Sequence, residues 1–143
     1  MGLDYKKSPG STTTSDLEEL VREAKRARES AYAPYSGFKV GAALRAVSGE
    51  IITGCNVENA SYGLSICAER TAIVSAVARG HRDFDAIAVV TETSPPAPPC
   101  GQCLQSLVEF SGDMEVVLAG TGDERMLVRL HDLLPVRFEL RKE

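Results

Sequence analysis

The chain has 143 residues, enough for one compact domain, and its 43% hydrophobic and 25% charged residues are typical of a globular protein. Twenty acidic residues outnumber sixteen basic ones, giving a net charge of −4, and glutamates interleave with the main basic cluster at residues 22–28. This pattern argues against binding of long nucleic acid, and the absence of an apolar run near ~20 residues argues against a membrane span.

Residues 1–14 are rich in Ser, Thr and Gly, and no apolar stretch follows Lys6 and Lys7. We therefore expect a flexible N-terminal arm rather than a signal peptide, followed by a single domain over residues 15–143. Four cysteines in a chain without a secretion signal predict reduced thiols or metal ligands and a cytoplasmic location.

The first predicted helix starts at a capping-box pattern, Ser15 to Glu18, and runs to about Ala33, where Pro34 ends it. The elements predicted after it are a hairpin of strands 38–47 and 51–57, a helix over 67–80, a strand over 84–91, a helix over 100–112, strands over 114–119 and 126–130, and a helical turn at 132–134. This order predicts one mixed sheet with helices on both faces and right-handed parallel crossovers after residue 51.

Three cysteines have the spacing of a metal site. Cys100 and Cys103 lie three residues apart on a predicted first helical turn, so both sulfurs share one face, and Cys67 lies at another predicted helix start. Helix N-termini stabilise thiolates, the form that binds metal, and three protein ligands leave one position of a tetrahedral zinc open, as in catalytic sites. Cys55 lies inside a strand pattern, where we expect a small core residue rather than a fourth ligand.

Glu69 follows Cys67 by two residues. A carboxylate beside an open zinc can accept and deliver protons, although a glutamate in a first helical turn also interacts with the helix dipole. A lone C-x-x-C is equally typical of a redox pair. The addition of Cys-Ala-Glu, and of Pro99 directly before the second motif, matches the signature of zinc deaminases.

The sequence resembles the small, homotetrameric cytidine deaminases over roughly Leu17 to Phe138. The resemblance rests on three blocks and a weaker fourth, namely Tyr32–Leu44, Gly54–Arg70, Pro99–Cys103 and Leu133–Phe138. It implies a three-layer α/β/α fold with a five-stranded mixed sheet, and one Zn²⁺ per chain held by Cys67, Cys100 and Cys103. It also implies that Glu69 shuttles protons and that Arg70 lies beside the ligands.

The implied reaction is hydrolysis of free cytidine and 2′-deoxycytidine to uridine and 2′-deoxyuridine in pyrimidine salvage. In this resemblance Asn56 and Glu58 hold ribose hydroxyls, Phe38 and Phe138 pack on the pyrimidine, and backbone near Ala68 reads the amine. Phe138 is expected in a neighbouring subunit's pocket. The implied substrate-binding residues are Phe38, Asn56, Val57, Glu58, Asn59, Ala60, Ser61, Tyr62, Ala68 and Phe138.

The chain departs from the family pattern at Leu104, where the family usually has Arg. Arg70 is then left to offset the charge of the thiolates. Rival functions remain: a deaminase of another cytosine nucleoside, such as an antibiotic, shares the chemistry. A C-x-x-C oxidoreductase leaves Cys67 and Glu69 unexplained, and a structural zinc protein needs a fourth ligand.

Overall fold

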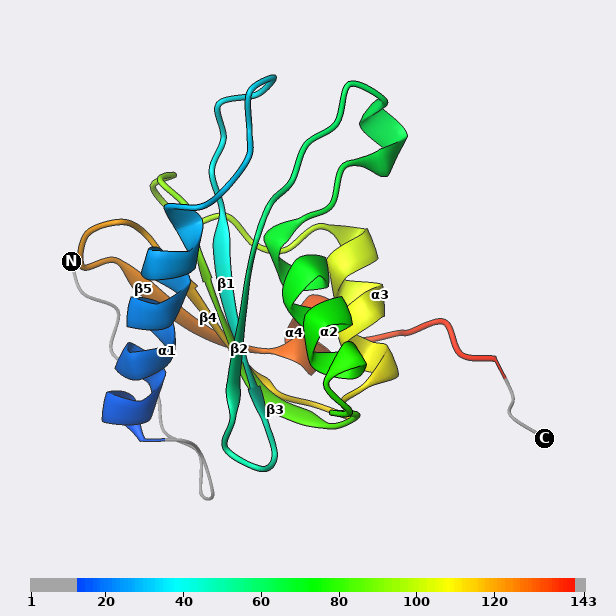
Figure 1. Ribbon diagram of the computed structural model, residues 1–143. Helices are drawn as coiled ribbons and strands as arrows, with labels where there is room; N and C mark the ends of the chain where they lie inside the picture. The colour runs from blue at the N-terminus through cyan, green and yellow to red at the C-terminus, as the bar shows by residue number, and fades with distance from the viewer. Residues whose placement is uncertain (1–12, 141–143) are drawn as a thin grey trace.

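A five-stranded mixed sheet with the strand order β2-β1-β3-β4-β5 forms the middle layer of the computed structural model, which describes residues 13–140. The elements are α1 (Thr14–Arg28), β1 (Gly41–Ala46), β2 (Ile51–Cys55), η1 (Tyr62–Leu64), α2 (Ala68–Ala78), β3 (Phe84–Val90), α3 (Gly101–Glu109), β4 (Glu115–Ala119), β5 (Arg125–Arg129) and α4 (Leu130–Leu133). Helix α1 covers one face of the sheet, and α2 and α3 cover the other (Figure 1). The predicted three-layer α/β/α architecture is confirmed.

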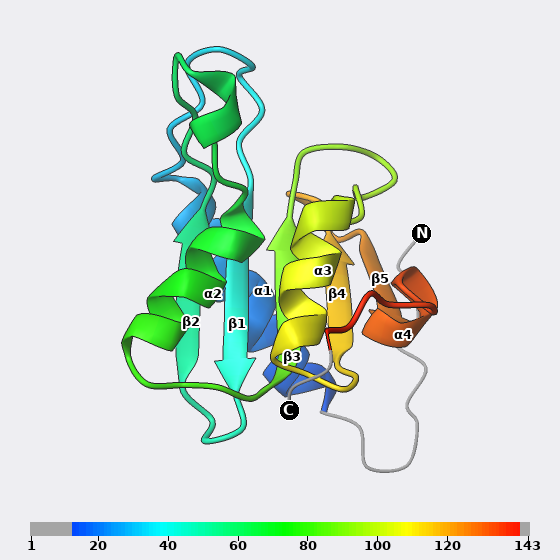
Figure 2. The same ribbon diagram turned by 90° about the vertical axis from the view of Figure 1, so that its right-hand side faces the viewer.

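Strands β3 and β4 are parallel neighbours, joined by α3. Strand β1 pairs antiparallel with both β2 and β3 and so separates these two strands, which therefore run in the same direction on either side of it. Strands β4 and β5 are antiparallel. As a result, the starts of α2 and α3 lie side by side at one end of the sheet (Figure 2).

Two apolar clusters hold the layers together. Small side chains of the sheet, including Ala43, Ala86 and Ala88, pack under α1, while larger ones such as Leu44 and Ile87 pack under α2 and α3. Successive strand residues alternate between the clusters, as the pleat requires. The small residues let α1 approach closely: a Cβ on Gly41 would lie 2.0 Å from the carbonyl oxygen of Ala24.

The structure corrects several predicted boundaries. Helix α1 is capped by Thr13, whose hydroxyl accepts a hydrogen bond from the backbone N–H of Asp16, and not by Ser15. It ends at Arg28 rather than near Ala33, because the chain then crosses to form a bridge between Tyr32 and Val57. The predicted strands 38–47 and 51–57 shorten for the same reason, since residues 29–40 and 56–66 project past the end of the sheet as two loops (Figure 2).

Most of the expected N-terminal arm, residues 1–12, lies outside the described residues. Every helix within residues 13–140 is too short or too polar to span a lipid bilayer.

Candidate active site

Three cysteine sulfurs meet where two helices begin. Cys67 is the N-cap residue of α2 and Cys100 is the N-cap residue of α3, with Cys103 in the first turn of that helix. The Cys67 and Cys100 sulfurs are 3.9 Å apart, and those of Cys100 and Cys103 are 3.5 Å apart. The predicted proximity of these three residues is confirmed by a structure that places all three sulfurs within 4.8 Å of one another.

This geometry fits a zinc ion. Sulfurs bound at about 2.3 Å to a tetrahedral zinc lie about 3.8 Å apart, close to the distances between these thiols. No other described residue joins the group as a fourth ligand. Cys55 pairs with Gly41 in the sheet, and Gly41 faces α1, so Cys55 points to the face opposite the thiol group. It is half-buried rather than fully buried as predicted.

One of the three thiols, that of Cys67, already favours loss of its proton. A hydrogen bond from the Cys103 thiol, with help from the guanidinium of Arg70 and the thiol of Cys100, lowers the pKa of Cys67 to about 5 against the effect of burial. Arg70 Nη2 lies 3.9 Å from the Cys67 sulfur and 3.3 Å from the carbonyl oxygen of Ser65. The sharing of a proton with Cys67, followed by burial, raises the pKa of Cys103.

Leu104, where the resemblance noted from the sequence leads us to expect an arginine, packs into the apolar cluster under α2 and α3 and is 9% exposed. Its side chain therefore brings no charge to the thiols, and Arg70 is the cation in contact with them.

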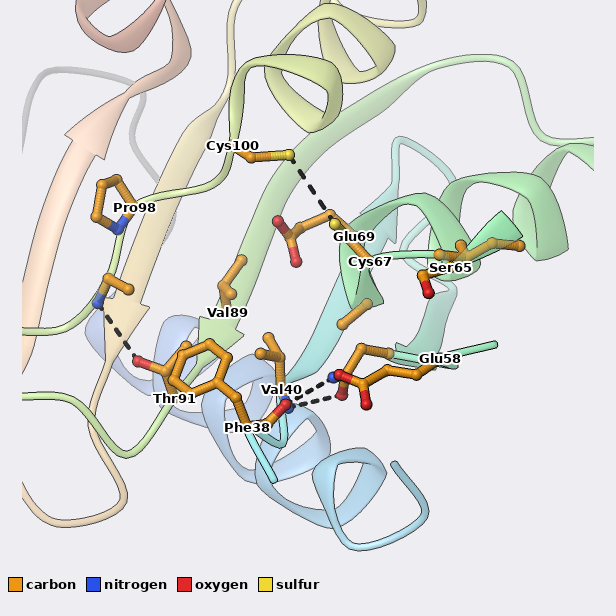
Figure 3. Close-up of a pocket in the computed structure, with 14 residues that line it drawn as sticks. Phe38, Val40, Glu58, Ser65, Cys67, Glu69, Val89, Thr91, Pro98 and Cys100 are labelled. Carbon is orange, nitrogen blue, oxygen red and sulfur yellow. Dashed lines mark hydrogen bonds between the residues drawn. The ribbon is translucent and has the colours of Figure 1, made fainter. Parts of the chain in front are cut away.

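Glu69 lies beside the thiol group and is 4% exposed. Figure 3 shows its carboxylate next to the sulfurs of Cys67 and Cys100, at the inner end of a pocket. Burial raises the pKa of this carboxyl, and the negative charge of Cys67 adds to the rise. A buried carboxyl with a raised pKa is suited to both accepting and delivering a proton.

Close packing of α2 on β2 determines where Glu69 lies in the pocket. A Cβ on Gly54 would lie 2.5 Å from both the carbonyl oxygen of Ala68 and the backbone nitrogen of Ala72, so only glycine lets the helix start approach this strand. The first turn of α2 thus lies directly on β2, and both Ala68 and Glu69 line the pocket.

The pocket has a volume of about 250 Å³ and runs from the thiol group to the loop that carries Phe38 (Figure 3). It is lined by Phe38, Val40, Asn56, Glu58, Ser65, Ile66, Cys67, Ala68, Glu69, Val89, Thr91, Ala97, Pro98 and Cys100. An apolar cleft with a few converging polar groups is the usual form of a small-molecule site.

Asn56 and Glu58, at the outer end of the pocket, also support the neighbouring loop. Asn56 Nδ2 donates to the carbonyl oxygen of Phe38 at 2.7 Å, and its Oδ1 accepts from the backbone N–H of Val40 at 2.8 Å. Glu58 Oε1 accepts from the backbone N–H groups of Tyr35 and Ser36, each at 3.0 Å, and Oε2 accepts from the Ser36 hydroxyl.

Because of these bonds, led by that of the Ser36 hydroxyl, the pKa of Glu58 is lowered and its carboxylate is ionised at neutral pH. Each carboxylate oxygen can accept about two hydrogen bonds, so Oε2 has capacity for a further donor.

The other residues expected at the substrate lie outside this pocket. Tyr62 lines a neighbouring hollow with Tyr35, and their rings meet edge to face with centroids 6.0 Å apart. Phe138 lies in a third hollow beside α3, where its carbonyl oxygen accepts from Gln105 Nε2 at 2.9 Å. The remaining expected residues outside the pocket are Val57, Asn59, Ala60 and Ser61.

Several residues that line the pocket were not predicted from the sequence, namely Val40, Ser65, Ile66, Val89, Thr91, Ala97 and Pro98. Three of them, Val89, Thr91 and Ala97, form one wall. Val89 and Thr91 lie at the carboxyl end of β3, which is parallel to its neighbour β4. Ligands commonly bind at the carboxyl ends of parallel strands, so the predicted crossover carried a signal for this wall.

Comparison with known proteins now identifies the family. Residues 14–120 match the family model for the cytidine and deoxycytidylate deaminase zinc-binding region. A cytidine deaminase from Halalkalibacterium halodurans is 48% identical over 86% of this chain and 94% of its own length. The crystal structure of a cytidine deaminase from Burkholderia pseudomallei is 52% identical with a TM-score of 0.83, and the match covers 89% of this chain and 100% of that one.

A blasticidin-S deaminase from Bacillus cereus is more distant, 31% identical over 69% of this chain and 76% of its own length. The chain belongs to the cytidine and deoxycytidylate deaminase family of hydrolytic enzymes.

Proposed function

We propose that the protein is a zinc-dependent cytidine deaminase that hydrolyses free cytidine and 2′-deoxycytidine to uridine and 2′-deoxyuridine, releasing ammonia. One observation carries this proposal: a buried Glu69 lies beside three converging thiols at the inner end of a pocket whose outer end presents Phe38 and Glu58. The relatives that match most of the chain, at 48% and 52% identity, are named cytidine deaminases.

The metal site would hold one Zn²⁺ per chain through Cys67, Cys100 and Cys103. When bound there, zinc supplies a Lewis acid that makes water a nucleophile near neutral pH. The donor set supports this assignment, since three thiolates without a fourth protein ligand are typical of a site with an open position. Arg70 offsets part of the negative charge of the thiolates by its contact with Cys67.

Glu69 moves the protons of the reaction. It takes a proton from the attacking water and delivers it to N3 of the cytosine as the oxygen joins C4. Glu69 then transfers the proton of the new C4 hydroxyl to the amine nitrogen, the C4–N bond breaks, and ammonia leaves with C4 as a carbonyl. The raised pKa of Glu69 suits this double role, because the group must gain and lose a proton within one turnover.

The rest of the pocket orients the nucleoside. Phe38 packs against the flat ring, backbone near Ala68 contacts the amine, and Asn56 and Glu58 bind sugar hydroxyls. We assign Val57, Asn59, Ala60, Ser61 and Tyr62 to the same sugar end or its subunit interface, and Phe138 to a neighbouring chain's pocket. Exposed apolar side chains support such an assembly, since Tyr62 is 75% exposed and Phe138 is 69% exposed.

We therefore propose a homotetramer built from a single domain over residues 15–143. Its place is cytoplasmic pyrimidine salvage, and the four free cysteines support a reducing compartment. Light scattering after gel filtration measures the mass of the assembly directly.

Turnover followed by ultraviolet absorbance tests the substrate class, with cytidine, 2′-deoxycytidine, cytosine, the 5′-monophosphate and a cytosine-nucleoside antibiotic compared at equal concentration. We expect both nucleosides to react fastest. Cytosine lacks the hydroxyls for Asn56 and Glu58, and within residues 13–140 no Lys or Arg lines the pocket to pair a phosphate. Faster turnover of the antibiotic or the nucleotide would contradict the proposal.

A further inference from the structure

The backbone that carries Phe38 into the pocket is held by side chains from both sides. Strand β1 begins only at Gly41, so residues 38–40 lack a regular sheet partner on each side. Asn56 bonds the carbonyl oxygen of Phe38 and the N–H of Val40. Between them, the carbonyl oxygen of Lys39 accepts from Arg28 Nε at 2.9 Å. The pose of Phe38 therefore depends on Arg28 as well as on Asn56.

The same guanidinium also reaches the segment that follows β3, which continues beside residues 38–40 because Gly41 pairs with Val90. Arg28 Nη2 lies 3.3 Å from Glu92 Oε2. Glu92 directly follows Thr91, which lines the pocket and whose hydroxyl accepts from the backbone N–H of Ala97 at 3.3 Å. Arg28 is thus connected to the loop that holds Thr91 and Ala97 as well as to the loop that holds Phe38.

The backbone of Arg28 is held in place by close packing of the end of α1 on β1. Arg28 is the last residue of α1, and a Cβ on Gly41 would lie 2.6 Å from its backbone nitrogen and 2.8 Å from its Cβ, so the helix end sits directly on β1. Its side chain is 21% exposed. An arginine is suited to this position because one planar guanidinium donates in two directions at once, which a lysine ammonium does with less geometric control.

We propose that Arg28 is a positioning residue that holds together the two neighbouring segments carrying Phe38 and Thr91, both of which line the substrate pocket, and so fixes the place of the Phe38 ring against the pyrimidine. The inference rests on the proposed function. Arg28 does not line the pocket; it acts through the Lys39 carbonyl on Phe38 and through Glu92 on the loop that follows β3. Loss of these two Arg28 contacts weakens substrate binding more than it slows the chemical step, because Glu69 and the thiols are held by other elements.

The test compares Arg28→Met with a matched control, Arg45→Met. Arg45 pairs with Asp85 at 2.7 Å, and the exposures of that pair, 16% and 44%, resemble the 21% and 54% of Arg28 and Glu92. It lies toward the other end of β1, away from the pocket. We expect Arg28→Met to raise KM for cytidine about ten-fold with kcat changed less than about three-fold. Arg45→Met should leave KM unchanged, and both variants should retain zinc.

A milder variant separates the two contacts of Arg28. Glu92→Gln alters an exposed side chain and leaves the bond to Lys39 in place, so we expect a two- to three-fold rise in KM, on the order expected for loss of one partly exposed ion pair. The double variant should have the same KM as Arg28→Met alone, because Arg28→Met already removes the Arg28–Glu92 ion pair. Three outcomes would contradict the proposal. They are a double variant whose rise in KM combines the rises of both single variants, an unchanged KM in Glu92→Gln, and a KM for Arg28→Met no higher than that of Arg45→Met. Failure of the unmodified protein to deaminate any cytosine nucleoside would instead contradict the proposed function.

Discussion

At the inner end of the pocket, Cys67, Glu69 and Cys100 lie on the first residues of two helices, whereas at its outer end Phe38 and Glu58 lie on irregular backbone. The inner groups are held by regular secondary structure packed closely on the sheet. The outer groups are held by hydrogen bonds between side chains and loops. The groups that carry the chemistry and those that select the substrate are therefore supported separately, so changes at the two ends should have different kinetic signatures.

Loss of a thiol at the inner end should have the largest effect. Cys103→Ala removes a buried ligand, and we expect loss of bound zinc together with activity. Cys55→Ala is the matched control, because this thiol faces away from the site and should leave about one zinc per chain. Metal content of the purified proteins distinguishes the two. Loss of zinc from Cys55→Ala would require a closed four-cysteine site instead.

Glu69→Gln keeps the shape of the side chain and removes its ability to carry a proton. We expect kcat to fall by at least ~10²- to 10⁴-fold, the usual contribution of a general acid–base, while zinc and fold are retained. Measurement of turnover and metal content on one preparation provides the check. Near-normal turnover in a zinc-loaded Glu69→Gln protein would remove Glu69 from the mechanism.

At the outer end, Glu58→Gln should act on KM rather than on kcat. We expect KM for cytidine to rise about ten-fold, because the charged acceptor for a sugar hydroxyl is lost. The internal control is 2′,3′-dideoxycytidine, which lacks the 2′- and 3′-hydroxyls that we assign to Glu58, so its KM should not change. An equal rise for both substrates would show that Glu58 acts only on the loop at Tyr35 and Ser36.

Phe138→Ala tests whether a second chain completes the outer end of the pocket. If a neighbour supplies this ring, we expect KM to rise about five-fold with zinc unchanged. Val136→Ala is a suitable control, since it alters a nearby apolar side chain that is 88% exposed. An unchanged KM in a tetrameric Phe138→Ala protein would contradict the role.

The smallest effect concerns a site outside the pocket. Burial opposes the ionisation of Asp113, but backbone N–H groups of His131 and Met114 and the guanidinium of Arg129 outweigh it and lower the pKa of the carboxyl. A lowered folded-state pKa stabilises the protein above the unfolded value of about 3.9, and the gain is lost as pH falls through the folded value.

Asp113→Asn should therefore lower the free energy of unfolding by about 0.5 kcal/mol at pH 7, a value reduced for solvent screening, and the difference should shrink below about pH 4. Urea unfolding across this pH range measures it. KM for cytidine should not change, and a changed KM would mean that the pocket is coupled to this distant loop.

Much of the inner end could be predicted from the sequence. Cys100 and Cys103 are one helical turn apart, and Glu69 is two residues from Cys67, so short-range geometry determines most of their arrangement. The outer end could be predicted only in part. The residues of the loop were evident, but their hydrogen bonds to Asn56 and Glu58 depend on how two loops meet beyond the sheet.

By itself, the sequence determined the strand and helix order, the Cys100–Cys103 pair and the place of Glu69 next to Cys67, because periodicity and short spacing control local structure. That Cys67 joins Cys100 was predicted by the resemblance and not by spacing, since the two residues are far apart in the chain. Only the tertiary structure decided that α1 ends at Arg28 and that this residue contacts both Lys39 and Glu92. It also decided that Val89 and Thr91 form a wall of the pocket, and that Cys55 faces away from the thiols. These contacts join segments far apart in the chain, and their geometry follows from the strand order and from the close approach of helices at Gly41 and Gly54, which residue spacing does not encode.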